Sequence, residues 1–301
     1  AGKICYNIIC IYEDYGGKPV KIFGNIGTFA YLTKTIGALG DHKRKIESLK
    51  AQGKTEEEIQ AIHEVCRLWS DKVVKYLNLK INVINPENLP EKGPVVYVSN
   101  HQSYADILVF LNVPKHQIGF IAKEELMKIP MFAGWILRIE SLFIKRGDAR
   151  ASLATINEGA KMIKDGYSLV IFPEGTRSRS NHMSSFKHGS LKLATKAKAT
   201  IVPITIKNSF KLYEETGKIR KGVTIDFIAH EPIDTSVMDR KELGELSEGE
   251  NILYSGIGRE FINLIENTNM SKVYKMPVLM AFYNHGNIRS QVSEEELLDS
   301  W

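Results

Sequence analysis

The sequence predicts an α/β fold, with a mixed, largely parallel sheet flanked by helices and an N-terminal pair of amphipathic helices. Two observations support this prediction. From residue 80 onward, short segments rich in β-branched residues alternate with segments of helical periodicity, an order typical of a sheet covered by helices. Before residue 80, apolar residues recur at helical spacing in residues 22–36 and 55–76. A chain of 301 residues that is 43% hydrophobic can bury the core that such a fold needs.

The two N-terminal segments differ in strength. Residues 22–36 place their apolar side chains on one face but contain glycines, so this helix would either lie in a membrane interface or pack on the rest of the protein. After a charged linker at residues 41–54, a firmer helix is expected, with a capping box from Thr55 to Glu58. Together the two helices would also suit a hairpin that docks on a membrane.

No stretch approaches the roughly 20 apolar residues that a membrane-spanning helix needs. Residues 4–12 are apolar enough to be the end of a longer hydrophobic segment that precedes Ala1.

The elements of the sheet follow from periodicity and from turn residues. We expect strands at 81–84, 95–99, 118–122, 141–145, 169–172, 201–206 and 223–228, and helices at 107–111, 131–137, 151–164, 189–197, 251–265 and 293–298. This organisation predicts N-terminal helices over residues 1–79, an α/β domain over 80–266 and a C-terminal extension over 267–301. In such sheets the chemistry lies on loops that follow the strands.

Charge and cysteine usage narrow the class of protein. The net charge of +5 comes from 40 basic and 35 acidic residues that are evenly spread, which suits anionic lipid or phosphate better than nucleic acid. Cys5, Cys10 and Cys66 lack the spacing of metal ligands and indicate a reducing, cytoplasmic setting. We interpret His182 and His188 as loop residues and expect no metal.

A histidine and an aspartate follow the strand predicted at 95–99. On a continuous helix Asp106 would lie about 140° around the axis from His101, so the two side chains meet only if the chain turns between them. A turn at residues 102–103 would let the carboxylate orient the imidazole as a general base, with Asn100 or Ser103 adding hydrogen bonds. A hydrogen-bonded loop pair without a catalytic role is the alternative.

The next candidate segment, Phe-Pro-Glu-Gly-Thr-Arg, directly follows the strand predicted at 169–172. Gly175 permits an unusual backbone, while Arg177 and Thr176 offer donors for a phosphate. Glu174 would orient Arg177 or accept a hydrogen bond from a substrate hydroxyl. A polar turn with solvated arginines is the alternative.

Further cations follow other predicted strands. Lys123 comes directly after one strand, and Lys145 with Arg146 ends another, so these side chains would converge on one anion if the strands are neighbours. Taken singly, each is more often a surface charge. Pro203 indicates an edge strand or a ligand-facing break in the strand ladder.

Four of these segments occur together and in order: NHQSYAD, SLFIKRG, FPEGTRS and IVPITI. They resemble the four motifs of the glycerolipid acyltransferase family, and the first and third are closest to those of bacterial 1-acylglycerol-3-phosphate acyltransferases. The resemblance covers residues 89–206. It implies acyl transfer from acyl-CoA or acyl carrier protein, with no metal and no cofactor beyond that co-substrate.

The resemblance also assigns roles. It implies His101 as the general base and Asp106 as its charge-relay partner. Substrate phosphate or glycerol would be bound by Lys123, Arg146, Glu174, Gly175, Thr176 and Arg177, with Asn100, Ser103 and Pro203 in support and Pro203 beside the acyl donor. Lys145 stands where many relatives carry an acidic or amide residue, which leaves the choice of acceptor open.

The expected reaction acylates the free hydroxyl of lysophosphatidic acid to give phosphatidic acid, at the cytoplasmic face of the cell membrane, with the protein bound peripherally or monotopically. The expected partners are lysophosphatidic acid, the acyl donor and an anionic membrane surface, and no nucleic acid. The alternatives are an acyltransferase for glycerol 3-phosphate or another lysophospholipid, and a non-catalytic peripheral lipid-binding protein.

Overall fold

The computed structural model describes residues 25–128, 130–145, 147–183, 186–187, 190–238, 283–284 and 287–288. The chain divides into two units, residues 1–251 and 252–301. In the second unit, strands β9 (Tyr283–Asn284) and β10 (Asn287–Ile288) pair antiparallel. The helices predicted at 251–265 and 293–298 lie outside the described residues.

The first unit is built on a mixed, largely parallel sheet, as the sequence predicts. Across the described residues the strand order is β1-β7-β6-β2-β5-β3-β4, with β8 pairing to β6. The strands are β1 (Lys80–Ile84), β2 (Val96–Ser99), β3 (Gly119–Lys123), β4 (Leu142–Ile144), β5 (Leu169–Ile171), β6 (Thr200–Lys207), β7 (Thr224–Ala229) and β8 (Ile233–Asp234). The seven predicted strands are confirmed, and β8 is an addition.

The direction of the strands decides where the loops meet. Strands β6, β2, β5, β3 and β4 run parallel to one another, whereas β7 and β8 run antiparallel to β6. The carboxyl ends of the five parallel strands therefore share one edge of the sheet. The loops after β2, β3, β4 and β5 carry the residues that the sequence singles out, so these loops start at the same edge.

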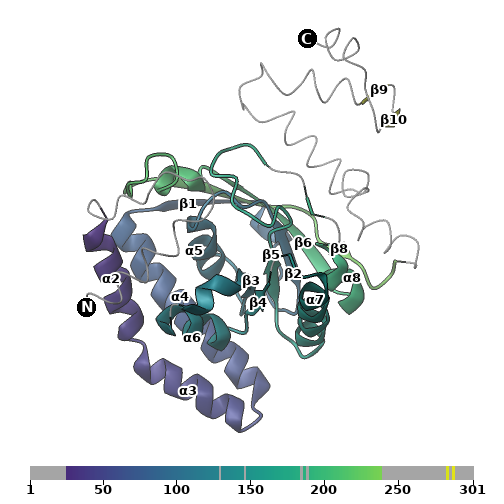
Figure 1. The fold of residues 1–301 in the computed structure, drawn as a ribbon, viewed down its shortest axis with the longest axis horizontal. Helices are drawn as coiled ribbons and strands as arrows, with labels where there is room; N and C mark the ends of the chain where they lie inside the picture. Colours follow the sequence, from purple (N-terminus) through teal and green to yellow (C-terminus); the bar gives the residue numbers. More distant parts are fainter. Residues whose placement is uncertain are drawn as a thin grey trace. The chain divides into compact units, whose positions relative to one another are not determined.

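Helices cover the sheet. They are α2 (Ile26–Gly37), α3 (Gly40–Ala51), α4 (Thr55–Leu77), α5 (Ala105–Asn112), α6 (Pro130–Arg138), α7 (Ala149–Lys164) and α8 (Lys192–Ala197), with short 3₁₀ turns η2 (Pro86–Asn88), η3 (Glu124–Lys128) and η4 (Ser209–Leu212). Figure 1 shows α2, α3, α4 and α6 grouped together, and α7 beside α8 at the other end of the sheet. The helices predicted at 107–111, 131–137, 151–164 and 189–197 are confirmed as α5 to α8.

The core joins the N-terminal helices to the sheet. Ile62 and Val65 of α4 belong to one buried cluster with Tyr97 of β2, Val170 of β5 and Val202 of β6. Burial of a side chain of this size stabilises the fold by roughly 1.5–3 kcal/mol. Helix α4 is therefore an integral part of the core around the sheet.

Two predictions for the N-terminal region are wrong. The charged linker expected at residues 41–54 is mostly helix α3, because Ile46 is buried to 1% exposure and anchors an otherwise polar helix. The capping box is absent: Lys54 is the N-cap of α4, and no side chain caps this end. Glu58 points inward instead, where it accepts a hydrogen bond from the hydroxyl of Tyr167 at 3.3 Å.

Helix α2 packs on α4 through aromatic side chains. The rings of Tyr31 and Tyr76 stack with their centroids 3.9 Å apart, and the indole N–H of Trp69 donates to Thr35 at 3.2 Å. Ile26 stays 50% exposed at the start of the helix. In the part of the chain that the structure describes, no helix is long and apolar enough to span a membrane.

Pro203 lies in the interior of the central strand β6, so it does not mark an edge strand. It does mark a break in the ladder: residues 200–201 pair with β8 and residues 204–207 pair with β7. The N–H of His230, in the connection between β7 and β8, donates to the carbonyl of Pro203 at 3.0 Å. Proline is tolerated because the ladder requires no N–H from it on this side.

Candidate active site

The loop after β2 brings His101 and Asp106 into contact. The chain turns at residues 102–103, and α5 begins at Ala105, so Asp106 lies in the first turn of that helix. Nδ1 of His101 lies 2.7 Å from Oδ2 of Asp106. The geometric requirement derived from the sequence is thereby met.

The carboxylate of Asp106 is held by the same loop. The backbone N–H groups of Gln102 and Ser103 donate to its Oδ2 at 2.7 and 2.9 Å. The side chain is fully buried, and its place at the N-terminus of α5 suits a negative charge. These contacts fix the carboxylate that faces the imidazole.

The imidazole of His101 is fixed on several sides. Its ring stacks on Phe172 with centroids 4.0 Å apart, and its side chain is 16% exposed. Because the carboxylate of Asp106 engages Nδ1, the tautomer with a free lone pair on Nε2 is favoured. This nitrogen is the position that can accept a proton from another molecule.

The turn after β5 is joined to the loop of His101 by the backbone of His101. The N–H of His101 donates to Oε1 of Glu174 at 2.7 Å, and its carbonyl accepts from the N–H of Ser178 at 2.7 Å. Gly175 between them adopts φ +66°, which glycine allows without strain. The first and third sequence motifs thus form one unit.

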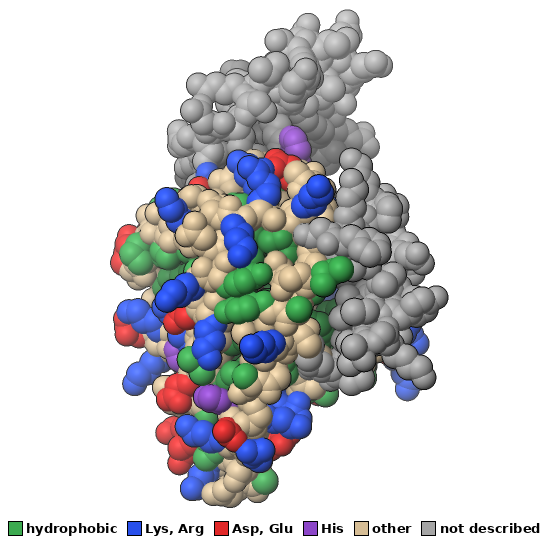
Figure 2. Space-filling view, turned by 90° about the vertical axis from the view of Figure 1, so that its left-hand side faces the viewer, with side chains coloured by type: hydrophobic (Ala, Val, Ile, Leu, Met, Phe, Trp, Pro, Cys, Tyr) green, Lys and Arg blue, Asp and Glu red, His purple; other side chains and the backbone are tan. Residues whose placement is uncertain are grey.

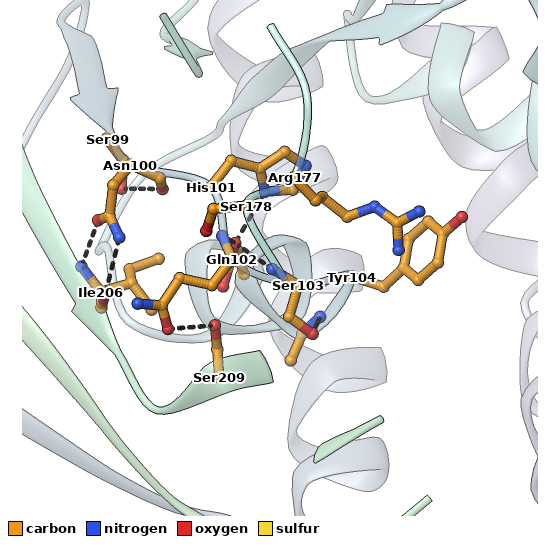
Figure 3. A network of polar contacts seen from close by, with 12 residues as sticks. Ser99, Asn100, His101, Gln102, Ser103, Tyr104, Arg177, Ser178, Ile206 and Ser209 are labelled. Atoms are coloured by element: carbon orange, nitrogen blue, oxygen red, sulfur yellow. Dashed lines mark hydrogen bonds and ion pairs between the residues drawn. The ribbon is translucent and has the colours of Figure 1, made fainter. Parts of the chain in front are cut away.

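Arg177 points from this turn toward Tyr104 (Figure 3). Its guanidinium lies 3.5 Å from the centroid of the Tyr104 ring, and its Nη1 donates to Oε1 of Glu214 at 2.9 Å. The residue that pairs with Arg177 is therefore Glu214, whereas Glu174 engages the backbone of His101.

Glu214 is a residue of the site that no motif in the sequence marks. Its side chain is 2% exposed, and it also accepts hydrogen bonds from the hydroxyl of Ser103 at 2.6 Å and the N–H of Tyr104 at 3.1 Å. Burial raises the pKa of Glu214, while the hydrogen bond from Ser103 and the charge of Arg177 act in the opposite direction. Its place in a polar stretch far along the chain gives no signal in the sequence.

The supporting residues have separate roles in the structure. Asn100 clamps the loop to β6, since its amide donates to the carbonyl of Ile206 at 2.9 Å and its Oδ1 accepts from the N–H of Ile206 at 2.7 Å. Gln102 contacts Ser209 at 3.3 Å (Figure 3). Ser103 joins the loop to Glu214.

Of the other predicted cations, Lys123 lies at the edge of the sheet that carries the site, whereas Lys145 is exposed to solvent. Lys123 ends β3 at the shared edge of the sheet and pairs with Glu125 at 3.0 Å. Lys145 follows β4, is 60% exposed at its side chain and lies 4.0 Å from Asp148. Arg146 and His188 lie outside the described residues. Thr176 is exposed on the turn, and His182 is exposed in the loop that follows.

An apolar cavity of about 380 Å³ opens beside the loop of His101. Ser103, Tyr104 and Ala105 contribute to its wall, and helices α2, α4, α5 and α6 supply most of the rest. The lining includes Leu108, Leu111, Trp69, Phe132, Trp135 and Ile139. Such a space suits a hydrocarbon chain, and it begins at the loop that carries the candidate base.

Comparison with known proteins agrees with this geometry. Residues 80–207 match the model of the Acyltransferase family. The chloroplastic 1-acyl-sn-glycerol-3-phosphate acyltransferase of Arabidopsis thaliana is 35% identical over 181 residues, which are 59% of this chain and 50% of that protein. The 1-acyl-sn-glycerol-3-phosphate acyltransferase of Borreliella burgdorferi is 30% identical over 169 residues, 56% of this chain and 68% of that protein.

A similar match comes from Saccharomyces cerevisiae, whose 1-acyl-sn-glycerol-3-phosphate acyltransferase is 32% identical over 57% of each chain. The matched region covers 50% of the Arabidopsis thaliana protein and 52% of the chloroplastic 1-acyl-sn-glycerol-3-phosphate acyltransferase of Brassica napus. The chain therefore spans about half the length of these plant relatives. The crystal structure of the 1-acyl-sn-glycerophosphate acyltransferase PlsC from Thermotoga maritima has the same fold, with a TM-score of 0.58, 23% identity and coverage of 79% of this chain and 99% of that chain.

Proposed function

We propose a function for this chain from the premise that it belongs to the glycerolipid acyltransferase family. The 1-acyl-sn-glycerol-3-phosphate acyltransferases that it matches belong to the same family. The proposed activity transfers a fatty acyl group from a thioester, acyl-CoA or acyl carrier protein, to the free hydroxyl of 1-acylglycerol 3-phosphate, and forms phosphatidic acid. The observation that carries the proposal is the contact of 2.7 Å between His101 and Asp106, which leaves Nε2 of the imidazole free to accept a proton.

The proposed reaction is nucleophilic acyl substitution. Nε2 of His101 takes the proton of the acceptor hydroxyl while the hydroxyl oxygen forms a bond to the thioester carbonyl carbon. The tetrahedral oxyanion then collapses, the carbon–sulfur bond breaks, and the thiolate leaves with a proton returned from the imidazolium. Asp106 orients the imidazole and stabilises its charge, as in other histidine–carboxylate pairs.

Recognition of the acceptor is assigned to the loops at the same edge of the sheet. Arg177 would bind the phosphate with Lys123 and Arg146, and the turn at residues 174–176 would contact the glycerol. The hydrogen bonds between this turn and His101 support the assignment, because they hold the phosphate site at a fixed distance from the base. Pro203 beside the donor site stays a prediction, as does the absence of a metal or cofactor.

A fatty acyl chain of a substrate would occupy the apolar cavity. Its wall contains Ser103 and Tyr104 of the loop that carries His101, so a chain bound there would have its carboxyl or ester end close to the base. Burial in a lining that is almost wholly apolar would contribute about 0.8 kcal/mol for each methylene group.

The surface of the protein supports a further part of the proposal, a peripheral position at the cytoplasmic face of a membrane. Figure 2 looks at the side on which α2 and α3 lie, and it shows apolar side chains gathered among lysines and arginines. Helix α3 carries Lys43, Arg44 and Lys45, and Leu137 of α6 is 53% exposed. A basic surface with exposed apolar side chains suits anionic lipid headgroups.

The test is a turnover assay with the purified protein, a thioester donor and lysophosphatidic acid, in which thiol release is followed. We expect the substitution His101→Ala to lower turnover roughly 10³-fold or more, because the proton acceptor is lost. His182→Ala, which removes an exposed histidine, is the matched control and should leave turnover unchanged. Thermal melting of both variants checks that they fold.

The outcomes separate the alternatives. Turnover with glycerol 3-phosphate but not with lysophosphatidic acid would assign a different acceptor. Lipid binding without turnover in the wild-type protein would favour a non-catalytic lipid-binding protein. Full turnover in His101→Ala would contradict the assignment of the base.

A further inference from the structure

Lys187 places a further cation on the turn between β5 and α8. If a Cβ atom were built on Gly175, its nearest neighbours would be Cδ, Cε and Nζ of Lys187, at 2.8, 2.8 and 2.9 Å. The lysine side chain therefore occupies the space that the glycine leaves open, directly over the turn that carries Glu174, Thr176 and Arg177.

The backbone of Lys187 is anchored at this place. Its N–H donates to the carbonyl of Pro173 at 2.9 Å, and its carbonyl accepts from the hydroxyl of Ser190 at 2.6 Å. The same hydroxyl also lies 3.2 Å from the carbonyl of Pro173. The stem of the side chain thus starts from a fixed point beside the turn.

Two other cations of the site are paired with carboxylates, whereas Lys187 is not paired with a carboxylate of the described residues. Arg177 is paired with the buried carboxylate of Glu214, and Lys123 is paired with Glu125. In the described ranges no carboxylate pairs with the ammonium of Lys187, which is exposed. An uncompensated ammonium attracts a phosphate more strongly than a cation whose charge is already balanced.

We propose that Lys187 binds a phosphate group of a substrate at the turn of residues 174–177. This inference rests on the proposed function, since it assigns a further binding residue to the same site. The phosphate could come from either of two substrates, the lysophosphatidic acid acceptor or a coenzyme A donor. The shared chemistry is a phosphate oxygen that accepts hydrogen bonds from the ammonium.

The test compares Lys187→Met with Lys187→Arg in the intact 301-residue chain. Methionine keeps an unbranched stem over Gly175 but has no charge, whereas arginine keeps the charge. We expect Lys187→Met to raise the KM for the phosphate-bearing substrate on the order of tenfold, with kcat nearly unchanged, and Lys187→Arg to restore most of the loss. Lys164→Met, at an exposed lysine in the last turn of α7, is the matched control.

The substrates identify which phosphate is bound. A rise in KM for lysophosphatidic acid but not for monoacylglycerol assigns the phosphate of the acceptor. A rise for acyl-CoA but not for a phosphate-free acyl thioester assigns the phosphate of the donor. An equal loss with phosphate-free substrates, or wild-type behaviour of Lys187→Met with every substrate, would overturn the inference.

Direct binding separates this inference from the proposed function. If the wild-type protein transfers no acyl group, the proposed function fails, and calorimetric titration with a water-soluble, short-chain lysophosphatidic acid and with coenzyme A still tests Lys187. Weaker binding of either ligand to Lys187→Met than to Lys164→Met would support the inference. Equal binding of both ligands by the two variants would refute it.

Discussion

At the scale of single residues, Glu214 links the two halves of the candidate site. One of its carboxylate oxygens contacts Arg177 and the N–H of Tyr104, and the other contacts the hydroxyl of Ser103. Tyr104 in turn supports the guanidinium of Arg177 with its ring. The carboxylate therefore sets the position of the arginine relative to the loop that carries His101.

This role predicts a coupling between Glu214 and Arg177. The substitution Glu214→Gln weakens the charge-assisted hydrogen bond that positions Arg177, which is worth roughly 1.5–3 kcal/mol. Because the loss of this position outweighs the release of the arginine charge, the KM for lysophosphatidic acid should rise about tenfold. In the Arg177→Ala background the same substitution should have little further effect. Steady-state kinetics of the two single variants and the double variant measure the coupling.

Glu215→Gln is the control, because Glu215 is the adjacent carboxylate and pairs with Arg220 on the surface. Losses that add in the double variant would mean that Glu214 acts through folding alone and not through Arg177.

The residues of the site were predictable where the motif is local. His101 and Asp106 are five positions apart, and the need for a turn between them follows from helix geometry. Glu214 and Lys187 were not predictable, because their places depend on how the loops after β6 and β5 fold back. A glutamate or lysine in a polar loop has the same local pattern whether it is solvated or buried.

At the scale of elements, the apolar cavity lies between helices that come from different parts of the chain. Helices α2 and α4 precede the sheet, while α5 and α6 are inserted between its strands. Leu111 lies near the end of α5 and lines the cavity. The dimensions of the cavity therefore depend on how α5 and α6 pack against the N-terminal helices.

Filling the cavity should shorten the preferred acyl chain. The substitution Leu111→Trp adds a larger ring to the wall, so substrates with long chains should lose turnover relative to substrates with short chains. A series of acyl thioesters and of lysophosphatidic acids of increasing chain length measures the preference. Leu153→Trp on α7, where Leu153 is 55% exposed and does not line the cavity, is the control. An unchanged chain-length profile would argue that acyl chains bind elsewhere.

The elements were predictable where periodicity is strong. The strands and the helices α4 to α8 follow the pattern of apolar residues, because each buries one face or both. Helix α3 has the composition of a linker because Ile46 is its one fully buried residue; Leu49 is only partly buried against the core, and Glu47 forms an ion pair with Arg138. The position of Pro203 was ambiguous, because a gap between two partner strands cannot be read from one strand.

At the scale of the whole first unit, apolar and basic side chains mix on the side where α2 and α3 lie (Figure 2). The ion pair of Arg138 with Glu47 joins α6 to α3, so these helices present a common surface. The order of the strands, with β6 and β2 at the centre, was not predictable from the sequence. It depends on long-range pairing between segments that are about 100 residues apart, Val96 with Ile201 for example.

If this side contacts the membrane, a negative charge introduced on it should weaken vesicle binding, whereas the same charge introduced elsewhere on the surface should not. Leu137 on α6 and Leu153 on α7 are 53% and 55% exposed, so their replacement by aspartate changes the solvated surface to a similar degree. We expect Leu137→Asp to weaken binding to vesicles that contain phosphatidylserine about tenfold, and Leu153→Asp to have little effect. Flotation of the full chain with such vesicles measures both. An equal effect of the two substitutions would place the membrane contact on another surface.

The hydrogen bonds that join two loops at His101 have a consequence for the timing of the proposed reaction. Both the N–H and the carbonyl of this residue are engaged by the turn of residues 174–178, so neither loop moves away without breaking a contact of 2.7 Å. A substrate held by that turn would meet an imidazole that already has its working orientation, and no loop closure would have to precede proton transfer. Release of the bulky phosphatidic acid product would then be the slower step, because both contacts oppose an opening of the loops.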